Sequence, residues 1–345
     1  MDIQDQISAD KIKAMRAAFE RAVQSIRDAT SLKYLEQLVA DNDVEGIIKL
    51  LGLDQSTFAP LTEAIRDSYS VGGSFTADVL TPIPTPQLGA VAFRFDMLSP
   101  AAVSWVANKS STLVTEFIED QRVMLRNVLA QGIEAGENPR ATAIGIVGRI
   151  DTTTGKRTGG FIMVTSQQQK WIDDARKELI ALDPHYKTRL LRDKRFDAMF
   201  DRAVKDGKPL TKAQIDKIIT RLQARTLKYR ADTIARTESI TALRAGQHEA
   251  MQQAIEKGEL DNSDVKKYWD ATGDGRTRLS HLEMESNYDD GIQFDALFHF
   301  PSGGVCKYAG DSSLGAPAGE IIQCRCRTVY KVDFIGRAKK VSGFR

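Results

Sequence analysis

Ligands that zinc prefers gather near the C-terminal end of this chain. They are one histidine, His281, and the three cysteines Cys306, Cys324 and Cys326. Thiolate and imidazole groups hold structural zinc in sets of four, usually with two to four residues between paired ligands. A single residue separates Cys324 from Cys326, so the spacing of this pair does not by itself identify a zinc site. Two interpretations stay open: a structural zinc site, or a metal-free cluster in which buried cysteine packs like a small apolar residue.

A second set of residues places opposite charges within a largely apolar helical pattern. Arg236 and Glu238 lie among mostly apolar positions, and an unpaired buried charge is costly. Asp274, Arg276 and Arg278 follow in a predicted loop, and an arginine can bind a carboxylate through two hydrogen bonds. The sequence therefore predicts a structural ion network of these five residues, with Glu238 paired to one of the loop arginines. We expect no catalytic residue, because the chain shows no Ser/His/Asp set, phosphate loop or dense carboxylate cluster.

Positive charge is concentrated in one segment, although the whole chain carries a net charge of only +2. Residues 186–230 contain 14 Lys or Arg against 5 Asp. Basic patches bind nucleic acid because their contacts with phosphates release counterions. The candidate DNA contacts are Lys212, Lys217, Arg221 and Arg225. The alternative interpretation of this segment is an ordinary solvated helix surface.

The spacing of apolar residues predicts a mainly helical chain. Residues 1–80 are expected to form helices that Gly72 and Gly73 interrupt, followed by an extended, proline-rich linker. Further helices are expected over residues 100–105, 111–134, 165–182 and 211–257. The last pattern is long enough for one continuous helix or for two helices that meet near Thr226.

The C-terminal part of the chain is expected to mix loops with short strands, near residues 265–269 and 326–334. The expected fold class is therefore α+β, with a predominantly helical N-terminal region and a compact, loop-rich α+β C-terminal domain. The expected division is a helical segment over residues 1–80, a mainly helical middle region over 81–204, the C-terminal domain over 205–335, and a basic, mobile tail over 336–345.

The composition excludes some classes of protein. With 345 residues, of which 42% are apolar and 27% charged, the chain has the balance of a globular protein that buries a sizeable core. Its sequence has no run of 18 apolar residues, so we expect no membrane partner. Three cysteines, an odd count, argue against a disulfide framework.

Three separated segments resemble the phage Mu F-like minor head proteins, which carry the phage head morphogenesis domain. The segments are Ala235-Arg236-Thr237-Glu238, then Trp269-Asp270 with Arg276-Thr277-Arg278 and His281, and finally Cys324-Arg325-Cys326-Arg327. They occur here in the family's order, and the resemblance covers residues 230–332 well. The chain departs from the family in two places. Arg278 stands where many members have a cysteine, and Glu320-Ile321-Ile322-Gln323 replace a run that often carries a histidine.

The resemblance implies a minor capsid protein of a tailed bacteriophage. We expect such a protein to bind the portal protein, and the major capsid protein or scaffold, and to act in head assembly, DNA packaging or ejection. It would be made in the host cytoplasm and reside in the virion, in the capsid interior or at the portal vertex. The family's cysteines and histidine imply structural zinc as the cofactor, with His281, Cys324 and Cys326 as its ligands. Cys306 is the candidate fourth ligand, although its position matches no ligand of the family. The alternatives are a nuclease or toxin-like enzyme carried in the virion, and a DNA-binding accessory protein that contacts the genomic DNA.

Overall fold

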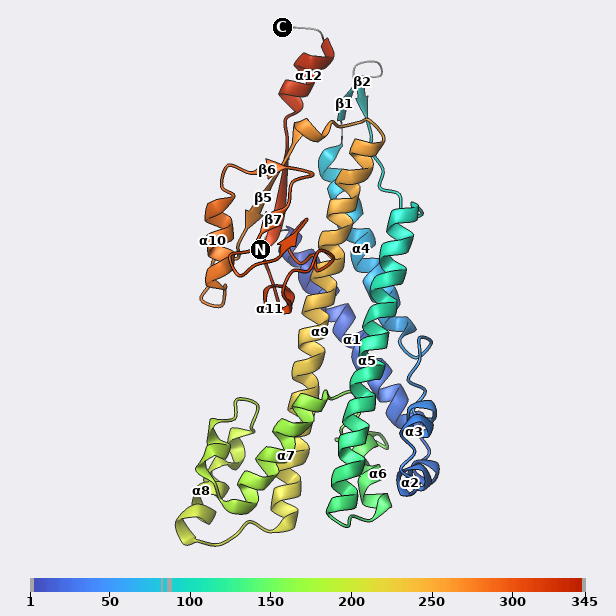
Figure 1. Ribbon diagram of the computed structural model, residues 1–345, viewed down its shortest axis with the longest axis vertical. Coiled ribbons are helices and arrows are strands. Elements are labelled where there is room, and N and C mark those ends of the chain that lie inside the picture. Colours follow the sequence, from blue (N-terminus) through green and yellow to red (C-terminus); the bar gives the residue numbers. More distant parts are fainter. Residues whose placement is uncertain (1–2, 82, 86–88, 343–345) are drawn as a thin grey trace. The chain divides into compact units, whose positions relative to one another are not determined.

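A computed structural model describes residues 3–81, 83–85 and 89–342 of the chain (Figure 1). Pro82 and Pro86 of the expected linker lie outside the described residues. The α-helices are α1 (Ile3–Ala29), α2 (Leu32–Ala40), α3 (Val44–Leu50), α4 (Ala59–Leu80), α5 (Pro100–Glu134), α6 (Pro139–Val147), α7 (Ser166–Ala181), α8 (Asp197–Asp206), α9 (Lys212–Glu256), α10 (Leu279–Asn287), α11 (Ala318–Ile321) and α12 (Phe334–Ser342). Short 3-10 helices are η1 (Pro184–Thr188), η2 (Lys194–Phe196) and η3 (Asn262–Asp264).

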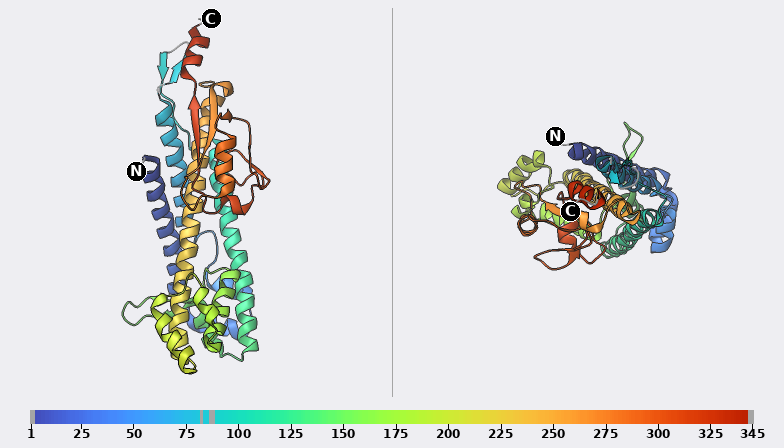
Figure 2. Two further views of the ribbon diagram at one scale, coloured as in Figure 1. Left: turned by 90° about the vertical axis from the view of Figure 1, so that its left-hand side faces the viewer. Right: turned by 90° about the horizontal axis from the view of Figure 1, so that it is seen from above.

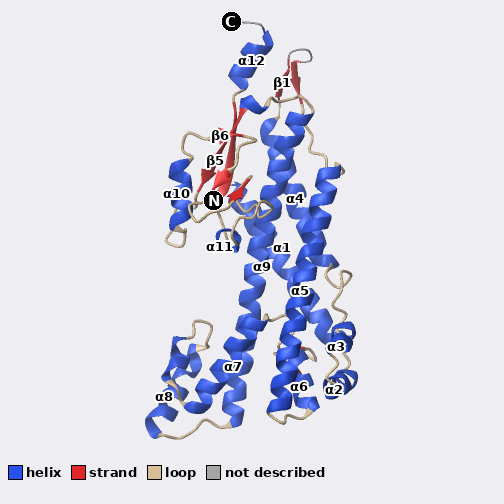
Figure 3. Cartoon of the chain, viewed as in Figure 1, coloured by secondary structure: helices blue, strands red, loops and turns tan. Residues whose placement is uncertain are grey.

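The strands form small antiparallel sheets, and most of the described chain is helical (Figure 3). They are β1 (Ile83–Thr85), β2 (Gly89–Val91), β3 (Arg149–Ile150), β4 (Arg157–Thr158), β5 (Val265–Asp270), β6 (Ile292–Gln293), β7 (Phe298–His299), β8 (Val305–Cys306) and β9 (Arg327–Val332). β6, β5 and β9 form a three-stranded sheet in that order, and the others pair as β1–β2, β3–β4 and β7–β8. The predicted fold class, helical first and α+β at the C-terminal end, is confirmed. No helix within the described residues is long and apolar enough to cross a membrane.

The chain divides into two compact units that alternate along the sequence. Unit 1 comprises Met1–Arg16, Leu61–Ser110 and Thr233–Arg345, and unit 2 comprises Ala17–Pro60 and Ser111–Asp232. The unit boundaries fall inside the helices α1, α4, α5 and α9. The units therefore differ from the expected consecutive division at residues 80, 204 and 335, because each of these long helices supplies residues to both units.

Local sequence signals explain several helix boundaries. The Thr165 hydroxyl accepts a hydrogen bond from the backbone N–H of Gln168, whose side-chain oxygen accepts one from the backbone N–H of Thr165. This reciprocal capping satisfies two amides that the first turn of α7 leaves unpaired. The patterns at 100–105 and 111–134 form one helix, α5, because the residues between them include neither glycine nor proline. The pattern at 211–257 likewise forms a single helix, α9.

Glycine allows two helices of unit 1, α4 and α9, to approach closely. A Cβ atom added at Gly72 of α4 would stand 2.0 Å from the carbonyl oxygen of Leu243 on α9. A Cβ atom added at Gly246 of α9 would stand 1.9 Å from the carbonyl oxygen of Tyr69 on α4. The expectation that Gly72 and Gly73 interrupt a helix is wrong, because both lie inside α4, where packing against α9 stabilises the helix despite their low propensity.

The C-terminal segment is anchored in unit 1 as far as Ser342, the end of α12. Arg337 on this helix is 5% exposed, and its Nη1 atom lies 2.9 Å from Asp264 and 3.5 Å from Asp261. The expectation of a mobile basic tail therefore needs correction at Arg337, which a buried ion pair with Asp264 holds in place. Residues 343–345 lie outside the described part of the chain.

Candidate metal site

The three-stranded sheet of unit 1 brings the second motif segment, which begins at Trp269-Asp270, next to the third, which ends at Arg327. β5 and β9 run antiparallel with Asp270 opposite Arg327, and Figure 2 shows this sheet from a second side. The Arg327 guanidinium donates a hydrogen bond to the Asp270 carboxylate at 2.7 Å. Because Cys324 and Cys326 immediately precede β9, this register carries both thiols to the end of β5.

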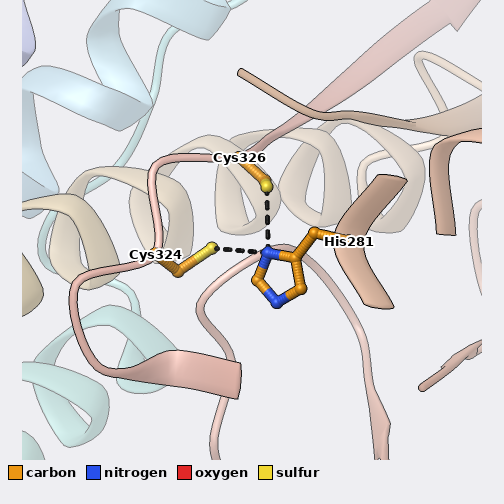
Figure 4. A group of neighbouring side chains, drawn as sticks. All are labelled: His281, Cys324 and Cys326. Atoms are coloured by element: carbon orange, nitrogen blue, oxygen red, sulfur yellow. Dashed lines mark hydrogen bonds between the residues drawn. The ribbon is translucent and has the colours of Figure 1, made fainter. Parts of the chain in front are cut away.

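His281, Cys324 and Cys326 meet in one buried cluster (Figure 4). His281 lies on α10, and its Nδ1 atom is 3.1 Å from the Cys326 Sγ atom and 3.7 Å from the Cys324 Sγ atom. All three side chains are between 1% and 3% exposed. In a tetrahedral zinc site with bonds of about 2.3 Å to sulfur and about 2.0 Å to nitrogen, neighbouring ligand atoms lie about 3.6 Å apart. The three residues therefore fit three corners of such a site.

Cys306, the expected fourth ligand, lies elsewhere in the same core. Among the described residues, the group that could hold a metal ion comprises His281 and the two other cysteines. Cys306 is fully buried on β8, and burial raises the pKa of its thiol to about 12, a rise that the Asp311 carboxylate increases. The structure thus does not bring Cys306 to a fourth corner, because pairing with β7 fixes β8 in another position.

Glu320 contacts the opposite side of the His281 ring, and the sequence offered no signal for this contact. Its Oε2 atom lies 2.9 Å from the His281 Nε2 atom. The Ser280 hydroxyl donates to the same carboxylate at 2.9 Å and the Ser302 hydroxyl at 2.6 Å. Burial alone would raise the pKa of Glu320, but these hydrogen bonds and the nearby imidazole bring the pKa below its usual value. The carboxylate is therefore charged and fixed in place.

The two thiols of the cluster differ in how readily they ionise. A hydrogen bond from the Cys326 thiol lowers the pKa of Cys324, with help from the Arg278 and Arg244 guanidinium groups, while burial opposes this effect. The same thiol–thiol hydrogen bond, together with burial, raises the pKa of Cys326. Of the two thiols, Cys324 therefore loses its proton more easily than Cys326. A bound divalent cation supplies the positive charge that lets both thiols ionise.

The contacts run from Cys326 to His281 to Glu320, which is also the order of a nucleophile, a base and an orienting carboxylate. A nucleophile must meet its substrate, however, and Cys326 is 2% exposed. The raised pKa of the Cys326 thiol also disfavours the reactive thiolate. Burial thus favours a structural role for this cluster over catalysis.

The segment that carries the two cysteines is fastened to α9. Gln323 has a φ of 59°, in the left-handed region that a residue with a Cβ atom seldom occupies. Its backbone N–H donates to the Thr237 hydroxyl at 3.0 Å, and its side-chain amide donates to the Thr233 hydroxyl at 2.8 Å. Thr233 and Thr237 are one helical turn apart, so they face the same direction. These bonds give Thr237 of the Ala-Arg-Thr-Glu segment a direct part in placing the cysteines.

Trp269 of the second segment forms one wall of the cluster. Its ring meets the His281 ring edge-on, with 5.4 Å between centroids. Phe298 and Phe300 meet Trp269 in the same way, at 5.4 and 5.5 Å. Such edge-to-face pairs stabilise a core beyond the area that they bury. The three segments noted in the sequence therefore converge on His281 and the two cysteines.

The charged residues are paired differently from the expected network. Glu238 is 7% exposed and lies 2.9 Å from the Nζ atom of Lys109 on α5, which takes the place of a loop arginine. Asp274 accepts two hydrogen bonds from Arg325, at 2.5 and 2.6 Å, and these bonds lower the pKa of Asp274 below its usual range. The expected pairing of Glu238 is thus corrected, since the partner comes from a helix more than 120 residues earlier in the chain.

The remaining members of the expected network lie near these pairs. Arg276 is exposed, and its Nη2 atom is 3.4 Å from Asp274. Arg278 donates to the carbonyl oxygen of Ile322 at 2.6 Å, which ties the start of α10 to the cysteine segment. Arg236 lies half-buried on α9. Instead of one network of five residues, the structure forms separate contacts, and those of Glu238 with Lys109, Asp274 with Arg325 and Arg278 with Ile322 join distant segments.

The four basic residues proposed for DNA contact are all exposed on the part of α9 in unit 2. At about 100° per residue, Lys217 and Arg221 share a face of the helix, whereas Lys212 lies roughly half a turn from Arg221. Arg225 lies closer to the first pair, but it donates to a backbone carbonyl at 2.5 Å and lies 3.7 Å from Asp193. The segment thus presents a smaller basic face than the count of charges suggested.

Comparison with known proteins identifies the segment that contains this cluster. Residues 194–329 match the family described as phage Mu protein F like protein. No curated protein and no solved structure matches the chain. The match begins near η2 and ends within β9, so it includes α9, the candidate metal site and all three motif segments. Residues 194–329 of this chain are therefore similar to the phage Mu protein F-like family, and this similarity implies a protein of phage head morphogenesis.

Proposed function

We propose that this chain is a minor capsid protein that binds the portal of a tailed bacteriophage and acts structurally in head assembly. The match of residues 194–329 to the phage Mu protein F-like family carries this proposal. The burial of the His/Cys cluster supports a structural role over an enzymatic one. Contacts with the major capsid protein or scaffold, and effects on DNA packaging or ejection, belong to the same proposal.

A structural role of this kind predicts that the protein stays with the finished particle. Mass spectrometry of purified phage particles is expected to detect this chain at low copy relative to the major capsid protein. We also expect this chain to co-purify with the portal protein, and not with the major capsid protein alone. Detection in the infected-cell lysate but not in particles would contradict the proposal.

We propose in addition that His281 Nδ1 and the Sγ atoms of Cys324 and Cys326 hold a structural zinc ion. The distances among these atoms support the proposal, as does the ease with which the Cys324 thiol ionises. Zinc would supply a cross-link between α10 and the segment that precedes β9. The three protein ligands leave one position to water or to another small ligand.

This site predicts about one zinc per chain, because ligands this far apart in sequence meet only in the folded state. Elemental analysis of protein purified without chelator measures that ratio. Removal of the metal is expected to lower the melting temperature, and Cys324→Ser is expected to abolish binding. The matched control is Cys306→Ser, which alters a buried cysteine outside the cluster and should keep its zinc. Metal-free wild-type protein whose melting is insensitive to chelator would rule the site out.

A second proposal concerns genomic DNA, which the exposed basic face of α9 would contact. Lys217, Arg221 and Lys228 lie within about 40° of one another around the helix, and all three are exposed. Lys228 was not among the expected contacts. Three cations on one face suit the phosphates of a DNA duplex and carry no sequence preference of their own.

The DNA contact predicts a change in the salt dependence of binding. Replacing Lys217, Arg221 and Lys228 by glutamine should reduce the slope of log affinity against log salt by about three, roughly one for each lost phosphate contact. Lys212→Gln on the other side of the helix is the control and should leave the slope almost unchanged. Equal slopes for the triple variant and the wild type would show that this face is only solvated surface.

A further inference from the structure

We propose that Glu320 is a positioning residue that turns the His281 ring so that its Nδ1 atom faces both thiols. The two nitrogens of an imidazole ring lie on different edges and make different contacts. Here the Nε2 atom lies 2.9 Å from the Glu320 carboxylate, and the Nδ1 atom faces the Cys326 and Cys324 Sγ atoms. The negative charge of the carboxylate beside Nε2 favours the tautomer that carries its proton on Nε2, which leaves the lone pair of Nδ1 free to bind a metal ion.

The Glu320 carboxylate is itself held from two sides. The Ser280 hydroxyl, one residue before His281 on α10, donates to Oε2 at 2.9 Å. The Ser302 hydroxyl, in the turn between β7 and β8, donates to Oε1 at 2.6 Å. Since Glu320 is only 7% exposed, little water competes for these bonds. The carboxylate cannot follow the ring if the ring rotates, so it fixes the orientation of His281.

Glu320 does not reach the position of a ligand, because it contacts the edge of the ring away from the thiols. Its role is that of the carboxylate that orients a metal-bound histidine and makes it a stronger donor, and loss of such a carboxylate weakens metal binding about 10- to 100-fold. This inference rests on the proposed zinc site for its effect on affinity. The orientation of the His281 ring does not require a metal.

Two measurements on the full-length protein test the role of Glu320. The first is the ¹⁵N spectrum of its histidines without metal, in which His281 of the wild type should show a single tautomer with the proton on Nε2. Glu320→Gln keeps the size of the side chain but loses its charge, and it should shift both His281 nitrogen signals. Glu283→Gln, on the exposed side of the same helix, should shift neither.

The second measurement is zinc affinity by chelator competition, together with the absorption spectrum of the cobalt-substituted protein. Glu320→Gln should weaken zinc binding about 10- to 100-fold and change the cobalt spectrum. Ser302→Ala, which removes one of the bonds to the carboxylate, should give a smaller loss, and Glu283→Gln none. A purely structural role for Glu320 would lower the melting temperature without altering the cobalt spectrum.

The outcomes separate this inference from the zinc proposal. If Glu320→Gln leaves the His281 nitrogen signals unchanged, the positioning role is overturned, whether or not zinc binds. If the signals shift but the wild type binds no zinc, the zinc proposal alone is overturned. If the wild type binds zinc and Glu320→Gln binds it equally well with the same cobalt spectrum, the proposed effect on the metal is overturned.

Discussion

Gly246→Ala is expected to destabilise the protein by roughly 3 kcal/mol, near the upper end of the usual cost of overpacking. The new Cβ atom would stand 1.9 Å from the carbonyl oxygen of Tyr69 on α4. That atom belongs to a helix backbone, so a side-chain rotation cannot relieve the clash, and α4 and α9 must move apart. Gly72 makes the reciprocal contact with Leu243, so separation would open both contacts together. Urea unfolding should show a lower transition midpoint for this variant.

The matched control is Gly145→Ala on α6. This glycine also lies inside a helix, but an added Cβ would meet nothing closer than the Phe161 ring at 3.8 Å. Because alanine favours a helix over glycine by about 1 kcal/mol, Gly145→Ala should be neutral or stabilising. Gly246→Ala is thus expected to destabilise the protein, whereas Gly145→Ala is not. A Gly246→Ala variant as stable as the wild type would show that α4 and α9 are not in close contact.

A fall in pH from 7 to 4.5 is expected to remove up to about 3 kcal/mol of stability through His248 alone. The His248 ring is stacked on Phe294 at 4.6 Å and lies 4.9 Å from the Tyr308 ring. Its Nδ1 atom is 3.1 Å from the Tyr330 hydroxyl oxygen. The residue is enclosed by aromatic rings of unit 1, a setting that a single histidine on a helix gave no reason to expect.

These surroundings favour the neutral form of the ring. Burial lowers the pKa of His248 from 6.5 to about 3, and the positive charges of Lys267 and Lys307 add to the effect. Above pH 6.5 neither the folded nor the unfolded state protonates this histidine, so its contribution to stability is fully present. Below pH 6.5 His248 binds a proton in the unfolded state but not in the folded state. The free energy of unfolding therefore falls until the pH reaches about 3.

The free energy of unfolding, measured by urea titration from pH 7 to 4.5, tests this prediction. His248→Gln should lower stability at pH 7 but reduce the loss between pH 6.5 and 4.5. His185→Gln is the control, since the side chain of His185 is 64% exposed and pairs with Glu178 at 2.7 Å. If wild type and His248→Gln lose stability equally over this range, His248 is not held neutral in the folded protein.

Much of the fold could be predicted because its signals are local. The capping residues before α7 and the uninterrupted pattern of α9 depend on neighbours a few residues away. The candidate site was partly predictable for another reason. His281, Cys324 and Cys326 are uncommon residue types with known chemistry, so their presence drew attention before their proximity was known. The family resemblance rested on motif residues that could likewise be read without coordinates.

By itself, then, the sequence determined the helical and α+β character, the family resemblance of residues 194–329 and three members of the cluster. The tertiary structure decided which partners those residues meet. Lys109 pairs with Glu238, Glu320 with His281, and Gly246 with the backbone of α4, each across a long stretch of chain. Glutamate, lysine and glycine occur throughout the sequence, so their types single out none of these positions. Which of these residues become partners depends on hydrogen-bond distance and on steric fit. Neither is defined until the packed helices and the β5–β9 register bring distant segments within a few ångströms of one another.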